Sequence, residues 1–249
     1  MKHPEIKSLY KYRAFNEFSL QMLITETAWF AKPSSFNDPF DCGILIDEER
    51  MEESIQTAIT EAYARNGVRE EEIPRHELEI KQEDKEAFYS YRNSVNITIQ
   101  NTGIFSLSEV NNDILMWAHY ADSHKGFCIE YSRSPDNILG KTAEPVLYQE
   151  ELPSLSASAV TSRNGSGINS LWLTKSSHWR YEREWRILSH KGGNSHEFPC
   201  RIASIIFGLN MSRENRYTIR RIMENRGIIF KEALREKRKF GLIISETQT

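Results

Sequence analysis

The spacing of its short strand-like segments is the strongest constraint on how this chain can fold. In several of these segments, apolar and polar residues alternate over a few positions, which is the period of a β-strand. Helical patterns occur in blocks between these segments rather than after every strand, and this disfavours a doubly wound parallel sheet. We therefore predict an α+β fold, a single domain over residues 1–249 with a central mixed or antiparallel sheet. Its strands are expected at residues 8–13, 104–108, 127–132, 181–188 and 202–208.

Two segments are expected to lie outside this sheet. Residues 47–101 are highly charged and carry apolar residues on one stripe, which predicts a helical insertion that begins at Asp47 and breaks at Pro74. Residues 153–169 are poor in apolar residues and rich in serine and glycine, which predicts a flexible loop.

The net charge, the cysteines and the lack of long apolar runs limit the classes of protein to which this chain can belong. The net charge of −3 gives no general affinity for a nucleic-acid backbone, although basic clusters occur at residues 213–226 and 235–239. The 3 cysteines form no close pair, which is typical of reduced thiols in a cytoplasmic protein. No apolar run reaches the roughly 18 residues of a membrane span. We expect a soluble cytoplasmic protein without a membrane partner, whose protein or nucleic-acid target the sequence does not identify.

The stretch "YEREWRI" raises the central question of function. In an extended chain Glu182, Glu184 and Arg186 point to one face, and the aromatic and apolar residues to the other. One interpretation is a solvated sheet face. The other is a polar cleft lined by two carboxylates and a guanidinium, and the sequence leaves both open.

A second polar stretch, "SSFNDPFDC", places Asn37, Asp38 and Asp41 around Pro39. Asn and Asp side chains bond their own backbone and proline fixes φ, so a turn explains the pattern without a function. The alternative is a loop that holds a ligand. Two aspartates alone have no metal-specific spacing, so we predict no metal here.

A third stretch, "WAHYADSHKG", places His119 and Tyr120 on a predicted helix capped by Asn112 or Asp113. His124 follows His119 at a spacing that differs from that of a zincin helix, so packing and hydrogen bonding explain the pattern better than zinc. The chain also lacks the G-x-S-x-G, P-loop and G-x-G-x-x-G motifs.

These blocks together resemble a known family. "LYKYR", "WFAKPSSFNDPFDC", "FSLSEVNNDILMWAHYADSHKGFCIEY" and "YEREWRI" are similar to the bacterial family called domain of unknown function 2971, over residues 9 to about 240. The resemblance implies no established activity. It implies that these blocks are the family's motifs and that the helical stretch and the serine-rich loop vary.

A shorter similarity links the chain to ADP-ribosyltransferases. Arg13, "FSLS" and "YEREW" occur in the order of that family's Arg, Ser-x-Ser and Glu-x-Glu elements, although Leu107 stands where the family has threonine. This resemblance implies NAD as a substrate and Glu184 as the carboxylate that stabilises an oxocarbenium-like cation. It implies catalytic roles for Glu184, Glu182 and His119, and NAD contacts from Arg13, Ser106, Tyr120, Asn37, Asp38 and Lys175.

Three hypotheses follow. The first is an NAD-dependent ADP-ribosyltransferase-like enzyme, or an NAD glycohydrolase, acting in bacterial conflict or defence. The second is a non-catalytic module that binds a nucleotide or a protein and regulates. The third is a metal-dependent, nuclease-like hydrolase built on the Asp and Glu residues.

Overall fold

The computed structural model describes residues 1–43, 51–153 and 171–247. The expected helix start at Asp47 and nearly all of the expected loop at 153–169 lie outside these residues. The chain divides into two compact units, which are described separately. Unit 1 comprises Met1–Ala31, Gly103–Val146 and His178–Thr249, and unit 2 comprises Lys32–Thr102 and Leu147–Ser177. The elements confirm the α+β class with a central mixed sheet, while the extent of one domain over 1–249 stays a prediction.

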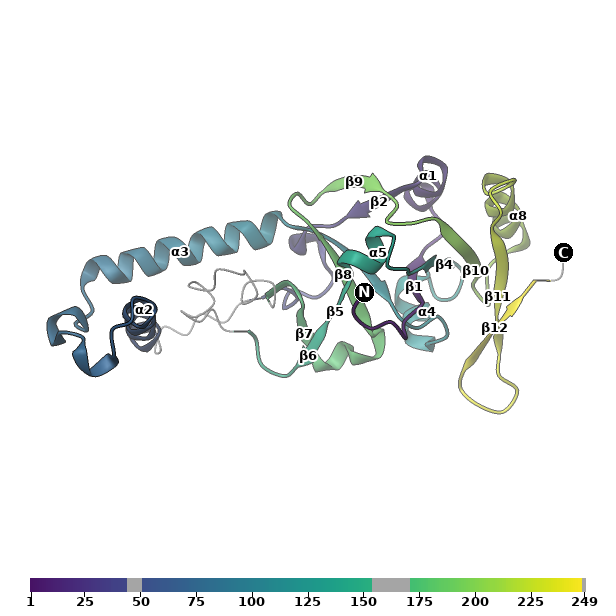
Figure 1. Ribbon diagram of the computed structural model, residues 1–249. Helices are drawn as coiled ribbons and strands as arrows, with labels where there is room; N and C mark the ends of the chain where they lie inside the picture. Colours follow the sequence, from purple (N-terminus) through teal and green to yellow (C-terminus); the bar gives the residue numbers. More distant parts are fainter. Residues whose placement is uncertain (44–50, 154–170, 248–249) are drawn as a thin grey trace. The chain divides into compact units, whose positions relative to one another are not determined.

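The described part of unit 1 contains an eight-stranded sheet in the order β12-β11-β10-β4-β1-β3-β8-β5 (Figure 1). Neighbouring strands are antiparallel except β10 and β11, which are parallel. The strands are β1 (Ser8–Arg13), β3 (Gly103–Ser108), β4 (Phe127–Ser132), β5 (Glu144–Pro145), β8 (Glu184–Ser189), β10 (Ile202–Phe207), β11 (Ile229–Arg235) and β12 (Leu242–Glu246).

Alternation along these strands divides the unit 1 core between the two faces of the sheet. Leu9, Phe105, Ile129 and Trp185 belong to the larger apolar cluster on one face. The opposite face carries Tyr12, Cys128 and Ile206, which pack with Trp117. The strand predictions at 8–13 and 127–132 are confirmed at both ends.

Helices of unit 1 begin where the sequence places capping side chains. Asn16 accepts a hydrogen bond from the Ser19 amide, Asp113 from two amides, and Ser212 from the Asn215 amide. The helices of the described part of unit 1 are α1 (Glu17–Thr25), α4 (Ile114–Tyr120), α5 (Ile138–Thr142) and α8 (Arg213–Ile222). Outside the large sheet, β2 (Thr27–Phe30) pairs with β9 (Asn194–Glu197).

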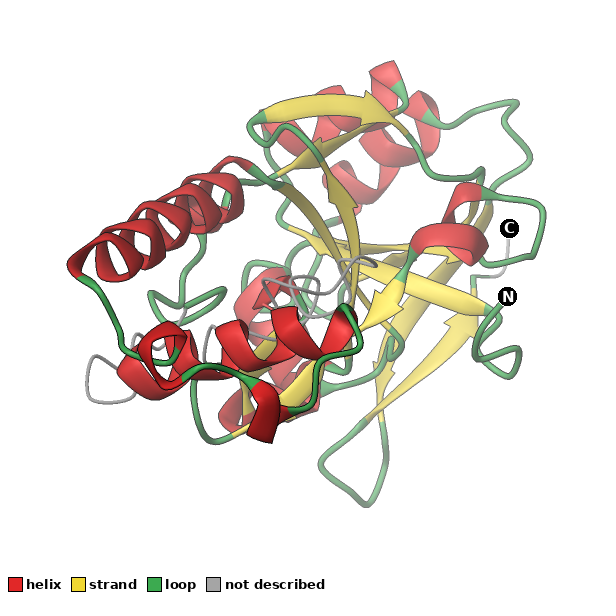
Figure 2. Ribbon diagram, turned by 60° about the vertical axis from the view of Figure 1, so that its left-hand side comes forward, coloured by secondary structure: helices red, strands yellow, loops and turns green. Residues whose placement is uncertain are grey.

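The described part of unit 2 is mainly helical, and helices are drawn in red in Figure 2. The structure confirms helix within the predicted insertion, and Pro74 lies between two short 3₁₀ turns, as the predicted break requires. The elements are η1 (Pro33–Ser35), α2 (Met51–Arg65), η2 (Glu70–Glu72), η3 (Arg75–Glu77), α3 (Gln82–Asn101), and the parallel pair β6 (Leu147–Gln149) and β7 (Thr174–Ser176). The two long helices, α2 and α3, are joined by an ion pair, in which Lys85 Nζ of α3 lies 2.5 Å from Glu52 Oε1 of α2. Among the described residues of both units, no helix is long and apolar enough to cross a membrane.

One glycine is required where β1 ends. A Cβ at Gly126 would lie 2.0 Å from the Arg13 carbonyl oxygen, which is backbone and cannot rotate away. We predict that Gly126→Ala lowers the free energy of unfolding by at least about 2 kcal/mol, measured by urea denaturation. Gly241→Ala is the control, because its Cβ would meet side-chain atoms of Glu236 at 3.3 Å or more. Equal losses in the two variants would contradict this account.

Candidate functional site

The carboxylates and the guanidinium of "YEREWRI" are buried. The exposed fractions are 3% for Glu182, 5% for Glu184 and 0% for Arg186. Burying charge costs free energy unless each group is paired and hydrogen-bonded. The interpretation of this stretch as a solvated sheet face is therefore wrong, and the partners of the three side chains define a candidate site.

The backbone corrects one detail of the prediction. Residues Ser177–Glu182 form a 3₁₀ helix (η4), and β8 begins only at Glu184. Between them Arg183 has φ 42°, in the left-handed region. Glu182 is therefore not on a strand, and the prediction that it shares a strand face with Glu184 is wrong. Glu184 and Arg186 do share a face, because they are two positions apart on β8.

Glu184 and Arg186 form a bidentate ion pair. Arg186 Nε donates to Glu184 Oε1 at 2.8 Å, and Nη2 donates to Oε2 at 3.0 Å. Two parallel, charge-assisted bonds fix the orientation of both planar groups. Register places Glu184 opposite Ser108 and Arg186 opposite Ser106, so both serines of "FSLS" lie beside the pair.

Glu182 has different partners. The Tyr120 hydroxyl of α4 donates to Glu182 Oε1. The Ser108 hydroxyl donates to the Glu182 backbone carbonyl at 2.6 Å and accepts from the Val110 amide at 3.1 Å. The structure thus joins Tyr120 to Glu182 and places Ser108 beside both Glu182 and Glu184, while the role of these residues in a site stays a prediction. The second serine of the Ser-x-Ser pattern was the available signal for Ser108.

Several aromatic rings lie close to that of Tyr120, the residue that donates to Glu182. The ring centroid of His119, an exposed residue of α4, lies 6.3 Å from that of Tyr120 and 6.3 Å from that of Tyr181. The centroids of Trp179 and Tyr181 are 6.0 Å apart. Flat apolar rings beside a few fixed polar groups are a common lining for small-molecule sites.

Lys11 lies where the sheet opens next to this site. Among the described residues, β1 and β3 pair at one position, Tyr10 with Ser108. Beyond it the Lys11 ammonium donates to the Ser106 carbonyl at 2.5 Å and lies 4.9 Å from the centre of the Phe105 ring. Burial, together with the neighbouring Arg13, lowers the pKa of Lys11 to about 7, while Glu184 and Glu182 act in the opposite direction. Sequence reasoning missed Lys11, because the divergence of β1 and β3 has no local pattern.

By strand alternation Arg13, like Lys11, belongs to the sheet face opposite that of Glu184. It pairs with Phe127, a member of the larger apolar cluster, whereas Glu184 is on the face of Tyr12. Its buried Nε atom has no hydrogen-bond partner within the described residues. Burial lowers the pKa of Arg13. The strand order does place the Arg13, Ser106 and Glu184 strands side by side, as β1, β3 and β8.

The remaining predicted site residues belong to unit 2. Asp38 Oδ1 accepts from the Phe40 amide at 2.9 Å, which is the turn geometry that the sequence allowed, and Asn37 is exposed. Lys175 of β7 lies with its Nζ 3.5 Å from Asp41 Oδ2, and both side chains are buried. The convergence of these residues with those of unit 1 stays a prediction. Among the described residues, no group of at least three His, Cys, Asp or Glu side chains could hold a metal ion.

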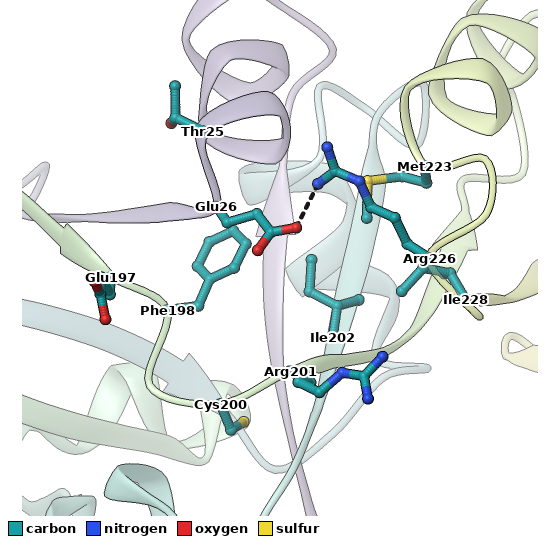
Figure 3. Close-up of a pocket in the computed structure, with 10 residues that line it drawn as sticks. All are labelled: Thr25, Glu26, Glu197, Phe198, Cys200, Arg201, Ile202, Met223, Arg226 and Ile228. Atoms are coloured by element: carbon teal, nitrogen blue, oxygen red, sulfur yellow. Dashed lines mark hydrogen bonds and ion pairs between the residues drawn. The ribbon is translucent and has the colours of Figure 1, made fainter.

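A separate pocket lies within unit 1 and has a cavity volume of about 610 Å³. Its wall combines apolar side chains such as Phe198, Ile202 and Met223 with charged ones. Figure 3 shows Arg226 directed towards Glu26, and the two side chains are 2.7 Å apart. None of the predicted site residues lines this pocket.

Comparison with known proteins gives one match. A family model described as "Protein of unknown function (DUF2971)" matches residues 116–187. This segment runs from α4 into β8 and contains His119, Tyr120, Lys175, Glu182 and Glu184. It supports the family resemblance seen in the sequence. No curated protein and no solved structure matches the chain.

Breaking the buried ion pair should be costly. Arg186→Met leaves the Glu184 carboxylate buried without its guanidinium, and we expect a loss of about 3–5 kcal/mol in the free energy of unfolding. Arg221→Met removes an exposed pair with Glu224 and should cost no more than about 1 kcal/mol. Urea denaturation measures both. Similar losses would show that the Arg186 pair has no special role in stability.

The lowered pKa of Lys11 predicts a pH-dependent stability. Between pH 7 and the ordinary lysine pKa of 10.5, the unfolded state holds a proton that the folded state has lost, so the free energy of unfolding rises with pH. Lys11→Met should remove this rise, whereas Lys141→Met, at an exposed position, should keep it. Thermal unfolding from pH 6 to 10 measures the effect. Parallel curves for wild type and Lys11→Met would contradict the assignment.

Proposed function

We propose that this protein binds NAD and cleaves its nicotinamide–ribose bond, either as an ADP-ribosyltransferase-like enzyme or as an NAD glycohydrolase. One observation carries the proposal: Glu182 and Glu184 are both buried, both beside β3, and held by chemically different partners. Enzymes that cleave glycosidic bonds commonly use two carboxyl groups whose surroundings give them different roles.

The chemistry assigns a role to each glutamate. Loss of nicotinamide leaves positive charge on the ribose, and a fixed carboxylate stabilises that charge. Glu184 fits this role, because the two hydrogen bonds from Arg186 fix the orientation of its carboxylate. Glu182 accepts from the Tyr120 hydroxyl, a neutral donor, and would orient the attacking hydroxyl or water.

Other side chains supply binding. The rings of Tyr120, Tyr181 and His119 would stack on the nicotinamide or the adenine, and Ser106 would contact the sugar. Of the two cations on β1, Lys11 interacts electrostatically with both glutamates. Lys11 therefore takes the phosphate contact that the resemblance assigns to Arg13. Both residues are on the same face of β1, but the Lys11 ammonium reaches the opening beside β3, where it donates to the Ser106 carbonyl.

The second candidate is a nucleotide-binding module without catalysis. It is favoured by the Arg186–Glu184 pair itself, in which the charge of Glu184 is already compensated inside the protein. A compensated carboxylate can position a ligand while contributing little to a transition state. The two candidates share the site and differ in turnover.

Glu184→Gln separates them. If Glu184 acts on the developing cation, this variant should lose about 10²–10³-fold in turnover and keep its NAD affinity. Lys11→Met should instead weaken NAD binding, because it removes a contact made in the ground state. Nicotinamide release and transfer of labelled ADP-ribose to lysate proteins measure turnover, and calorimetry measures affinity.

Glu232→Gln is the matched control, since Glu232 forms an ion pair with Arg216 elsewhere in unit 1 and should leave both quantities unchanged. Each variant is first shown to be folded at the assay temperature by its melting curve. NAD binding without product under any condition supports the binding module. Absence of NAD binding in calorimetry rejects both nucleotide proposals.

A further inference from the structure

The loop between β11 and β12 is the most positively charged short segment that the structure describes. Its residues Lys237, Arg238 and Lys239 are exposed, as is Arg235, the last residue of β11. Within the described residues, no ion pair or hydrogen bond occupies their side chains. The loop is nevertheless ordered at its base, where the Glu236 amide donates to the Gly241 carbonyl at 3.0 Å. In Figure 1 it extends beyond the ends of both strands.

Phe240 stands next to these cations with its ring fully in solvent. Its exposed fraction is 102%, so the ring buries no surface against the rest of the protein. At the base of the same hairpin, Leu234 and Ile243 are cross-strand partners and are 41% and 51% exposed. Two further exposed apolar side chains thus lie on the same hairpin as the basic tip.

The fold explains neither feature. Four like charges close together repel one another, and an exposed phenylalanine contributes no hydrophobic stabilisation. The chain as a whole has a net charge of −3, so the concentration of positive charge at one tip is not a general property of the surface. Unpaired cations beside an accessible aromatic ring fit a ligand that carries both phosphates and flat bases.

We propose that the β11–β12 hairpin is a binding site for single-stranded nucleic acid. The cations contact backbone phosphates, and Phe240 stacks on a base. The ring requires an unpaired base, because the base faces in a duplex are already stacked. A lipid surface fits less well, because one fully exposed ring gives little area to insert between lipids. This inference is independent of NAD chemistry at the buried glutamates.

The test is fluorescence anisotropy with labelled oligo(dT) and oligo(U) over a series of salt concentrations. If all four cations contact phosphates, the logarithm of the association constant should fall linearly with the logarithm of the salt concentration, with a slope of about −3. The triple variant Lys237→Glu, Arg238→Glu, Lys239→Glu should abolish binding. Phe240→Ala should weaken it about tenfold with an unchanged slope, since it removes stacking and no charge.

The matched control reverses three exposed lysines elsewhere in unit 1, at Lys125, Lys141 and Lys191, and so changes the net charge equally. Its affinity should fall much less than that of the hairpin variant. Equal losses would mean that net charge and not the hairpin governs binding, and would overturn the proposal. Absence of binding to either oligonucleotide at low salt would also overturn it. So would Phe240-dependent binding to phosphatidylserine vesicles without oligonucleotide binding.

Discussion

The buried ion pair between Arg186 and Glu184 is the constraint on which the polar side of the sheet depends. Both groups pay desolvation on burial, so each must keep its partner. The pair also fixes the register of β8 against β3. A slip of one residue would place Trp185 and Ile187 on the polar face and drive the two charges into the larger apolar cluster. The neighbouring Tyr120–Glu182 contact is then determined by where β8 begins.

Much of the sheet could be predicted from sequence, and the reason is local. The strands β1 and β4 are short segments rich in aromatic residues, which favour strands, and the caps at Asn16, Asp113 and Ser212 act on amides of their own first turns. The position of Glu182 could not be predicted, because it depends on the left-handed backbone of Arg183, a residue type that rarely adopts it. The alternation of side chains between two faces continues through Arg183 in the sequence, but the left-handed backbone at Arg183 interrupts it in the structure.

Only part of the candidate site could be predicted, because its residues come from segments that are far apart in the sequence. The sequence singled out Glu184 and Tyr120 by residue type and motif, and the structure joins Tyr120 to Glu182 and Glu184 to Arg186, while their role in a site stays a prediction. Lys11 was missed and Arg13 was chosen, although both lie on β1, because the choice between them depends on where β1 leaves β3. The pocket beside Glu26 and Arg226 has its lining divided among three distant segments, which no motif links.

The opening between β1 and β3 makes the sheet less rigid at that place than its strand order alone suggests. Hydrogen-bonded ladders make a sheet stiff in its own plane, and the described ladders β1–β4 and β3–β8 each run over six residue pairs. Between these two ladders, the described residues provide one paired position and the Lys11 side chain. The sheet therefore consists of two rigid groups of strands, which are joined flexibly between β1 and β3. We expect bending and shear of the sheet to occur mainly at this boundary, beside the buried glutamates.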